Sequence, residues 1–227
     1  MVTSLKLKGG TKWLPISVAN FERHLRQLIV PVSDFNAEKS LALQKNVAYS
    51  LQHLEFLHRC EVDLAITSVI STQNTKAFIV VGCGIIEALF YYVLVANGKA
   101  AKTEWQSASK LTTPEFELNG KRYRSEVKYL EKLATPVLEQ MSFDAMCKRV
   151  EKSDLAKLGS GELYKHLPHL RSLRNRVHIH DVSCMKDTDW VRFNRKDLNL
   201  VKQVLLLLLQ SSFFPQKNTE RFYFLSE

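Results

Sequence analysis

Residues 77–96 form an almost unbroken apolar run that carries one charge, Glu87. The run is long enough to cross a membrane, but a carboxylate near the middle of a membrane helix costs about 2.5–3.5 kcal/mol. Gly82 and Gly84 fit a helix that packs closely against another helix. Because a helix that is apolar on nearly all sides is normally buried, we expect residues 76–97 to form the central helix of a cytoplasmic protein that does not enter the membrane.

Further helices are expected around this central one. Apolar residues at helical spacing predict a long helix that Ser33 or Asp34 caps and that ends near Cys60. The polar run 71–75 is expected to cap the central helix, and Asn97-Gly98 to end it. The remaining predicted helices cover residues 18–29, 125–133, 142–152, 163–177 and about 194–212.

A polar and basic stretch, about residues 99–135, separates these helices. Its Asn119-Gly120 pair, between two short runs, is the strongest short signal for a β-hairpin. Residues 222–225 are expected to form a short edge strand or a docked tail. The predicted fold class is therefore mainly α, an antiparallel helical bundle with a small inserted β-hairpin. We expect an N-terminal extension, a helical domain with this insertion, and a C-terminal tail, covering residues 1–33, 34–212 and 213–227.

The charge of the chain restricts its partners only loosely. Thirty-two Lys and Arg against 23 Asp and Glu give a formal net charge of +9, which favours nucleic acid first and an anionic membrane second. The four cysteines form no CxxC pair and are expected to be reduced, mostly buried thiols. The chain contains no Walker-type glycine loop, Gly-x-Ser-x-Gly elbow or His-Glu-x-x-His motif, so those enzyme classes find no support.

Residues 170–181 hold the highest concentration of side chains suited to catalysis or phosphate binding. Three arginines, one asparagine and two histidines lie there, near the end of a predicted helix. Pro168 interrupts that helix, and we expect its regular part to start there, because proline is tolerated in a first turn. Arg174 and His178 have i, i+4 spacing and share one face if the helix persists that far. A turn beyond the helix end can bring His180 back toward Arg174.

This stretch resembles the signature of the HEPN superfamily, whose members are small all-α domains. The family motif is an Arg and a His with four to six residues between them, the first of which is usually polar. Arg174, Asn175 and His180 match this motif with five residues between Arg and His. An apolar upstream helix with an acidic residue also recurs in the family, which makes Glu87 a candidate partner of the site. The resemblance covers roughly residues 35–212 and predicts a bundle of HEPN type.

The resemblance implies a metal-independent endoribonuclease, in a toxin or antiphage-defence setting. RNA would be cleaved by its own 2′-hydroxyl to a 2′,3′-cyclic phosphate and a 5′-hydroxyl. An imidazole can act as acid or base at neutral pH, and a guanidinium stabilises the charge of the transition state. HEPN domains commonly dimerise with the motif helices facing each other, so we expect a homodimer, with an antitoxin or another protein as a further partner. The expected catalytic residues are Arg174, Asn175 and His180, supported by His178 and Glu87.

Other cations of the chain are candidate RNA contacts. Arg171 and Arg176 flank the motif arginine, and Tyr123 is interleaved with basic residues in the expected hairpin, an arrangement that suits stacking on bases beside phosphate contacts. Such charges are also typical of a solvated helix or hairpin face. The candidate RNA-binding residues are Arg171, Arg176, Lys121, Arg122 and Arg124.

Three alternatives stay open. Arg171 with His178 is a second register of the motif, and Ile179 stands where a spacing of four would put the histidine. A non-catalytic HEPN-like module could instead bind RNA, a nucleotide or a protein. A metal site is the third, although no carboxylate or cysteine lies at a familiar ligand spacing, and we expect neither a metal nor a cofactor. Its candidate ligands are His166, His169, His178, His180 and Cys184.

Overall fold

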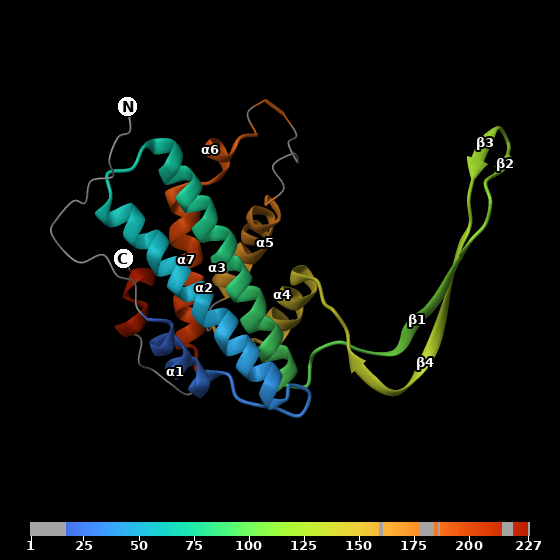
Figure 1. The fold of residues 1–227 in the computed structure, drawn as a ribbon, viewed down its shortest axis with the longest axis horizontal. Coiled ribbons are helices and arrows are strands. Elements are labelled where there is room, and N and C mark those ends of the chain that lie inside the picture. Colours follow the sequence, from blue (N-terminus) through green and yellow to red (C-terminus); the bar gives the residue numbers. More distant parts are fainter. Residues whose placement is uncertain (1–16, 159–160, 178–183, 186, 215–219, 227) are drawn as a thin grey trace. The chain divides into compact units, whose positions relative to one another are not determined.

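The computed structural model describes residues 17–158, 161–177, 184–185, 187–214 and 220–226 (Figure 1). The chain divides into a helical unit, residues 1–99 and 142–227, and an inserted unit, residues 100–141. The elements of the helical unit are α1 (Val18–Leu28), α2 (Ala37–Asp63), α3 (Ser68–Ala96), α4 (Phe143–Lys152), α5 (Gly161–Asn175), α6 (Asp189–Arg192), α7 (Arg195–Gln210) and the 3-10 helix η1 (Glu220–Leu225). The inserted unit contains β1 (Lys102–Thr112), β2 (Phe116–Leu118), β3 (Lys121–Tyr123) and β4 (Glu126–Leu138).

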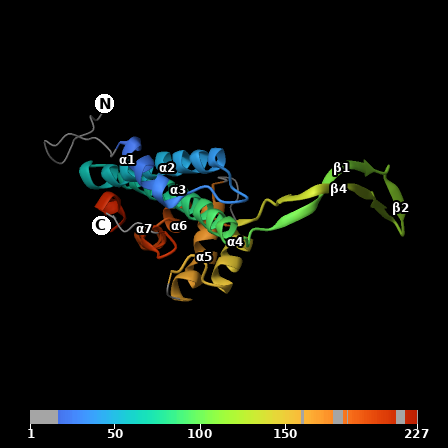
Figure 2. The same ribbon diagram turned by 90° about the horizontal axis from the view of Figure 1, so that it is seen from below.

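Helix α3 is the centre of the helical unit, as its apolar sequence predicts. It contacts α2, α4, α5, α6 and α7, with α2 on one side and α4, α5 and α7 on the other (Figure 2). By length and composition α3 could cross a membrane, but 67% of its most apolar window is buried inside the protein. A helix buried to this extent is typical of a protein core.

The start of α3 differs from the prediction. The polar residues 71–75 do not cap the helix but lie inside it, one turn after its first residue. They remain helical because their side chains find other partners: Ser71 donates to the Glu61 carboxylate at 2.9 Å, and Thr72 donates to the carbonyl of Ser68 at 3.0 Å. The predicted end is confirmed, since Asn97 follows the last turn and Gly98 adopts φ 64°.

Helix α2 begins later than predicted and also ends later, at Asp63. Its cap is Asn36, whose side chain accepts from the backbone N–H of Lys39 at 3.0 Å, and not Ser33 or Asp34. Before it, Val32 and Phe35 pair in an isolated bridge across a tight turn at residues 33–34, so Ser33 and Asp34 belong to this turn and not to the start of the helix.

The two ends of the described chain pack together in the helical unit. Helix α1 lies on α2, and its buried Phe21 stacks on Phe222 with ring centroids 6.2 Å apart. Phe224 meets the same ring edge-on. The docked tail is confirmed, whereas the edge strand is wrong, because residues 220–225 form a 3-10 helix.

Helices α4 and α7 occur where the sequence predicts them. Ser142 caps α4 by accepting from the N–H of Ala145 at 3.2 Å. Helix α5, in contrast, begins at Gly161, so the expectation that its regular part starts at Pro168 is wrong. The helix runs through this proline, which removes one backbone hydrogen bond.

Close packing of α3 on α7 explains one of the two glycines of α3. A Cβ atom at Gly82 would collide with Cγ1 of Val201, while a Cβ at Gly84 would meet nothing within 4 Å. Only Gly82 is therefore required for the approach of a neighbouring helix.

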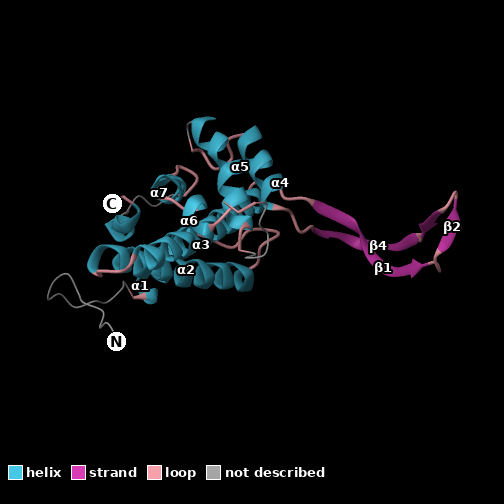
Figure 3. Cartoon of the chain, turned by 90° about the horizontal axis from the view of Figure 1, so that it is seen from above, coloured by secondary structure: helices cyan, strands magenta, loops and turns pink. Residues whose placement is uncertain are grey.

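The inserted unit consists of paired strands (Figure 3). The predicted hairpin is confirmed: β2 pairs with β3, and Asn119 and Gly120 adopt φ 51° and 70°, as a two-residue hairpin turn requires. The predicted helix over residues 125–133 is wrong, because this segment belongs to β4, which pairs antiparallel with β1. Its β-branched and aromatic residues favour a strand, and none of its side chains is buried as a helical stripe would be.

The insertion is also longer than the predicted 99–135, because the β1–β4 ladder extends to Leu138. At its base the N–H of Glu139 donates to the carbonyl of Ala101 at 2.8 Å. The molecule is thus mainly helical, and in the part of the chain that the structure describes all of its strands lie in the insertion.

Candidate functional site

Arg174 and Glu87 form an ion pair between α5 and α3. One terminal nitrogen of the Arg174 guanidinium donates to the Glu87 carboxylate at 2.9 Å. The two side chains keep 41% and 22% of their surfaces exposed. The carboxylate inside the apolar helix therefore has a cationic partner, and that partner is the arginine of the expected motif, with part of its guanidinium still open to solvent.

A buried thiol lies beside this ion pair. Cys83, one turn before Glu87 on α3, donates to the carbonyl of Leu170 on α5 at 3.6 Å. Burial raises the pKa of the Cys83 thiol to about 12, although the nearby charge of Arg174 acts to lower it. The thiol thus stays neutral and joins α5 to α3 near Arg174.

Of the other residues of the expected site near Arg174, the structure describes Asn175 but neither histidine. Asn175 is the last residue of α5, and its side-chain oxygen accepts from Arg174 at 3.4 Å. His178 and His180 lie outside the described residues. The convergence of Arg174 with either histidine, and the choice between the two registers, therefore stay predictions.

The two flanking arginines also bind carboxylates. Arg171 pairs with Asp144 of α4, and the pKa of Asp144 is lowered by a hydrogen bond from Lys148 and, against the effect of desolvation, by the charge of Arg171. Arg176 binds the buried Asp187 at 2.5 Å, and Arg192 of α6 binds the same carboxylate at 2.7 Å.

These pairs connect α5 to α4 and to the segment that leads into α6. The expected catalytic arginine, Arg174, and the two expected RNA contacts, Arg171 and Arg176, thus each have an acidic partner outside α5. A phosphate would contact guanidinium groups that are already oriented.

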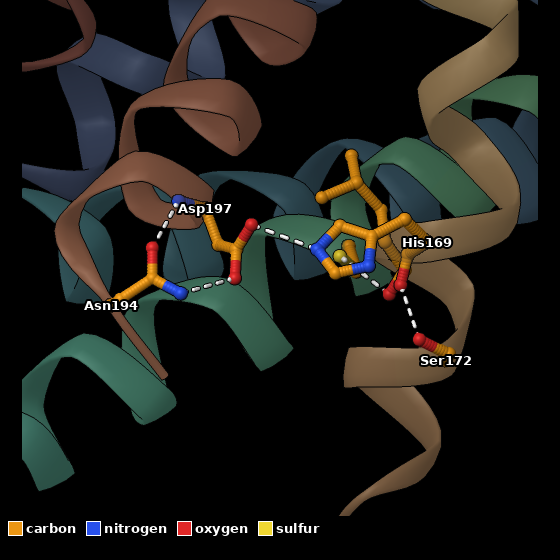
Figure 4. Close-up of polar contacts among 6 residues, drawn as sticks. His169, Ser172, Asn194 and Asp197 are labelled. Atoms are coloured by element: carbon orange, nitrogen blue, oxygen red, sulfur yellow. Dashed lines mark hydrogen bonds and ion pairs between the residues drawn. The ribbon is translucent and has the colours of Figure 1, made fainter. Parts of the chain in front are cut away.

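A histidine of α5 and an aspartate of α7 form a contact that the sequence did not predict (Figure 4). Nε2 of His169 lies 2.8 Å from the Asp197 carboxylate, whose other oxygen accepts from the side chain of Asn194 at 2.8 Å. The Asp197 side chain is 9% exposed and that of His169 is 49% exposed. Asn194 also caps α7 by accepting from the N–H of Asp197. The spacing of Asn194 and Asp197 in the sequence is that of a helix cap, but nothing in the sequence shows that α5 supplies the histidine.

Helix α6 is attached to α3 through another acidic residue. Asp189 accepts from Lys76 at 2.9 Å and from Gln73 at 3.1 Å. Although burial acts to raise it, the pKa of Asp189 is lowered overall by these two hydrogen bonds and by the charges of Lys76 and Arg176. This short helix, which the sequence did not predict, is thus oriented by polar contacts.

The basic residues of the hairpin belong to the inserted unit. Lys121, Arg122 and Arg124 are all exposed, and Arg122 lies opposite Glu117 in the β2–β3 ladder. Tyr123 stacks on Phe116 with ring centroids 6.0 Å apart. Cations and one aromatic pair are therefore exposed together at this tip.

The metal alternative gains no support from what is described. Among the described residues, no group of three His, Cys, Asp or Glu side chains could hold a metal ion. His169 is engaged with Asp197, and Cys184 is exposed. Two of the proposed ligands, His178 and His180, are not among those residues.

Comparisons of the chain with models of protein families, with curated proteins and with solved structures found no match. The HEPN resemblance therefore rests on the residues of the chain itself.

Proposed function

We propose that the protein is a HEPN-type, metal-independent endoribonuclease that acts as a cytoplasmic homodimer in a toxin or antiphage-defence setting. The observation that carries this proposal is the ion pair between Arg174 and Glu87. It joins the arginine of the motif to the acidic residue of the upstream apolar helix at 2.9 Å, while 41% of the Arg174 side chain stays exposed.

In the proposed reaction the 2′-oxygen attacks the adjacent phosphorus and the 5′-oxygen leaves. His180 accepts the proton of the 2′-hydroxyl, and a second imidazole, His178 or the copy of His180 in a dimer, donates a proton to the leaving oxygen. Arg174 binds the phosphate oxygens and stabilises their growing negative charge. Glu87 holds Arg174 in position, and Asn175 orients the guanidinium from its other side.

The exposed cations of the hairpin suit binding of the substrate. Lys121, Arg122 and Arg124 would contact phosphates along the strand, and the Phe116–Tyr123 pair offers a ring face for a base. Such contacts would weaken with rising salt, because each phosphate contact releases counterions.

The test is cleavage of total RNA by the purified protein in the presence of EDTA, with detection of 2′,3′-cyclic phosphate ends. Arg174→Ala and His180→Ala should each lower the rate at least about 100-fold, with unchanged circular dichroism. Arg26→Ala is the matched control, because Arg26 pairs only with Glu22 on its own helix among the described residues. Undiminished cleavage by both variants would contradict the assignment.

A non-catalytic HEPN-like module is the second candidate, and it is favoured by one observation. The three arginines near the motif each bind a carboxylate, Glu87, Asp144 or Asp187, as residues of a purely structural network do. This alternative predicts RNA, nucleotide or protein binding without cyclic-phosphate products, and Arg174→Ala would then lower stability and not a cleavage rate.

A further inference from the structure

The outer edge of β4 has no partner strand in the part of the chain that the structure describes, because β1 and β4 form a sheet of two strands. Residues 126–132 of β4 each pair with a residue of β1, and the extra residue at the register shift, Ala108, belongs to β1. All seven of these residues are exposed. A regular, exposed edge offers a row of N–H and C=O groups to a further strand.

The β1–β4 sheet has little else to stabilise it. A sheet that is stable by itself needs three or more strands with a hydrophobic face, or a helix packed on it. Residues 100–141 bury no hydrophobic side chain, and Tyr129 at the middle of the segment is 51% exposed. A further strand beside β4 would add backbone hydrogen bonds along an edge that now has none to another strand.

The charges of the inserted unit indicate what kind of strand fits this edge. Residues 100–141 contain seven Lys and Arg and six Glu, so the unit is almost neutral although the whole chain carries +9. A near-neutral mixture of both signs attracts a polyanion only weakly, whereas it can complement a strand with the same mixture. A second copy of this chain provides such a strand.

Antiparallel pairing of two β4 strands about a two-fold axis allows few registers. Successive side chains of a strand point to opposite faces, so residues that lie opposite each other must share a face, and one residue must lie opposite its own copy. Tyr129 is the middle residue of the segment 126–132. With Tyr129 at the axis, all seven residues of one copy pair with all seven of the other.

This register brings opposite charges together. Glu126 lies opposite Lys132 of the second copy, and Lys132 lies opposite Glu126 of the second copy, so two pairs of opposite charge form on one face. At the axis the two Tyr129 rings form an aromatic cross-strand pair, which is also favourable.

The two neighbouring registers lack this match. With Lys128 at the axis, the Lys128 ammonium would face its own copy. With Leu130 at the axis, Lys128 would lie opposite Lys132 of the second copy. Both arrangements place like charges directly opposite each other, which is destabilising.

The contacts that these charges make within one copy are compatible with the pairing. Glu126 binds Lys110 at 2.7 Å, and Lys132 lies 3.7 Å from Glu104. All four side chains are more than one third exposed, and an ionised carboxylate accepts from several donors at once. Each carboxylate can therefore bind a second cation without losing the first.

We infer that β4 pairs antiparallel with β4 of a second copy of this chain, with Tyr129 at the two-fold axis, so that the two sheets become one sheet of four strands. The surface involved contains none of the residues of the proposed ribonuclease site. The inference goes beyond the proposed function and does not depend on RNA cleavage.

The test is disulfide cross-linking of the full-length protein in a Cys184→Ser background, because Cys184 is the exposed cysteine of the wild type. In Tyr129→Cys the two introduced cysteines lie directly opposite each other, with Cα atoms about 4.5–5.5 Å apart, a distance that a disulfide spans. Mild oxidation should therefore give a covalent dimer on a non-reducing gel.

Val127→Cys is the matched control, on the same strand and the same face as Tyr129. In the inferred register the two introduced cysteines would be about 14 Å apart, because Val127 lies opposite Glu131 of the second copy. This variant should give at least about 10-fold less covalent dimer than Tyr129→Cys. Equal yields from the two variants, or no dimer from Tyr129→Cys, would overturn the inference.

Charge reversal with Tyr129 in place gives a second measurement. Glu126→Lys should raise the Kd of the dimer about 10-fold in sedimentation equilibrium, because it places lysines opposite each other in two symmetric pairs. Adding Lys132→Glu should restore most of the affinity. Glu115→Lys, the same change at an exposed position outside the strands, should leave the Kd unchanged.

A double variant that dimerises no better than Glu126→Lys alone would contradict the register and with it the inference. The RNA cleavage assay is a separate result. Loss of cross-linking with intact cleavage overturns only the pairing of β4, and cross-linking without cleavage overturns only the ribonuclease proposal.

Discussion

The helical unit and the inserted unit are stabilised in different ways. Every buried hydrophobic residue among those described belongs to the helical unit, and residues 100–141 contribute none. The inserted strands nevertheless carry large apolar side chains that are about half exposed, including Trp105, Leu111 and Leu130. The helices are thus held by side-chain burial, while the strands depend on their backbone ladder, which alone is marginally stable in water.

Side-chain contacts across the strands add little to that ladder. Lys110 binds Glu126 at 2.7 Å, but both side chains are more than one third exposed, and exposed pairs of this kind contribute about 0–1 kcal/mol. Lys110 also lies directly opposite Lys128, and like charges in such a pair are destabilising. A substitution of a given type should therefore change the free energy of unfolding much more in the helical unit than in the inserted unit.

The largest difference is expected for leucine truncation. Leu205→Ala, at a fully buried position of α7, should lower the free energy of unfolding by about 2–5 kcal/mol. Leu130→Ala, at a position of β4 that is 56% exposed, should change it by less than about 0.5 kcal/mol. Urea denaturation of both variants measures the two values, and equal losses would show that the strands bury Leu130 against a partner.

A matched pair of glycines tests the packing of α3. Gly82→Ala should destabilise the helical unit by about 1–3 kcal/mol, because the new methyl group displaces Val201. Gly84→Ala should stabilise it by up to about 1 kcal/mol, since alanine favours the helix and meets open space. Thermal unfolding of the two variants distinguishes these opposite signs, and the same sign in both would contradict the close approach of α7.

The hairpin turn should respond more locally. Gly120 has φ 70°, and an alanine in this left-handed region costs roughly 1–2 kcal/mol. Gly120→Ala should therefore speed amide hydrogen exchange in β2 and β3 and leave α3 protected. Gly120→Asn is the control, because asparagine tolerates this conformation better, and faster exchange throughout the helices would mean that the two units are stabilised together.

The smallest effect is expected at the polar attachment of α6. The pKa of Asp189 is lowered in the folded protein, so its contribution to stability is complete above the unfolded value near 3.8 and is lost as pH falls through the folded value. Asp189→Asn should cost less than about 1 kcal/mol at pH 6, and the difference from wild type should shrink below pH 4. A difference that is constant with pH would contradict a charged Asp189.

The sequence predicted those elements whose cause is local. The apolar run of α3, the helix predicted over residues 142–152 and the Asn119-Gly120 turn each depend on a few neighbouring residues, and all three are confirmed. Strands β1 and β4 were missed because their paired residues lie between 14 (Thr112 and Glu126) and 36 (Lys102 and Leu138) positions apart and because the strands bury nothing, so neither carries a hydrophobic pattern with a buried face.

The same distinction applies to the candidate site. Glu87 was expected to be a partner of the site. A carboxylate in an apolar helix must be compensated, and Arg174 provides the compensating charge. The contacts of Asp144 with Arg171 and of Asp197 with His169 were not predictable. They depend on how α4 and α7 lie against α5, which no local spacing encodes.

The hydrogen bond between Ala101 and Glu139 has a consequence for the order of folding. Helices α3 and α4 pack together although the whole insertion separates them along the chain. If β1 and β4 pair first, α3 and α4 are linked by a short connection in place of a long flexible loop. The entropy cost of closing a loop grows with the logarithm of its length. Early pairing of these strands would therefore speed the docking of α4 on α3, although the strands contribute no buried side chain.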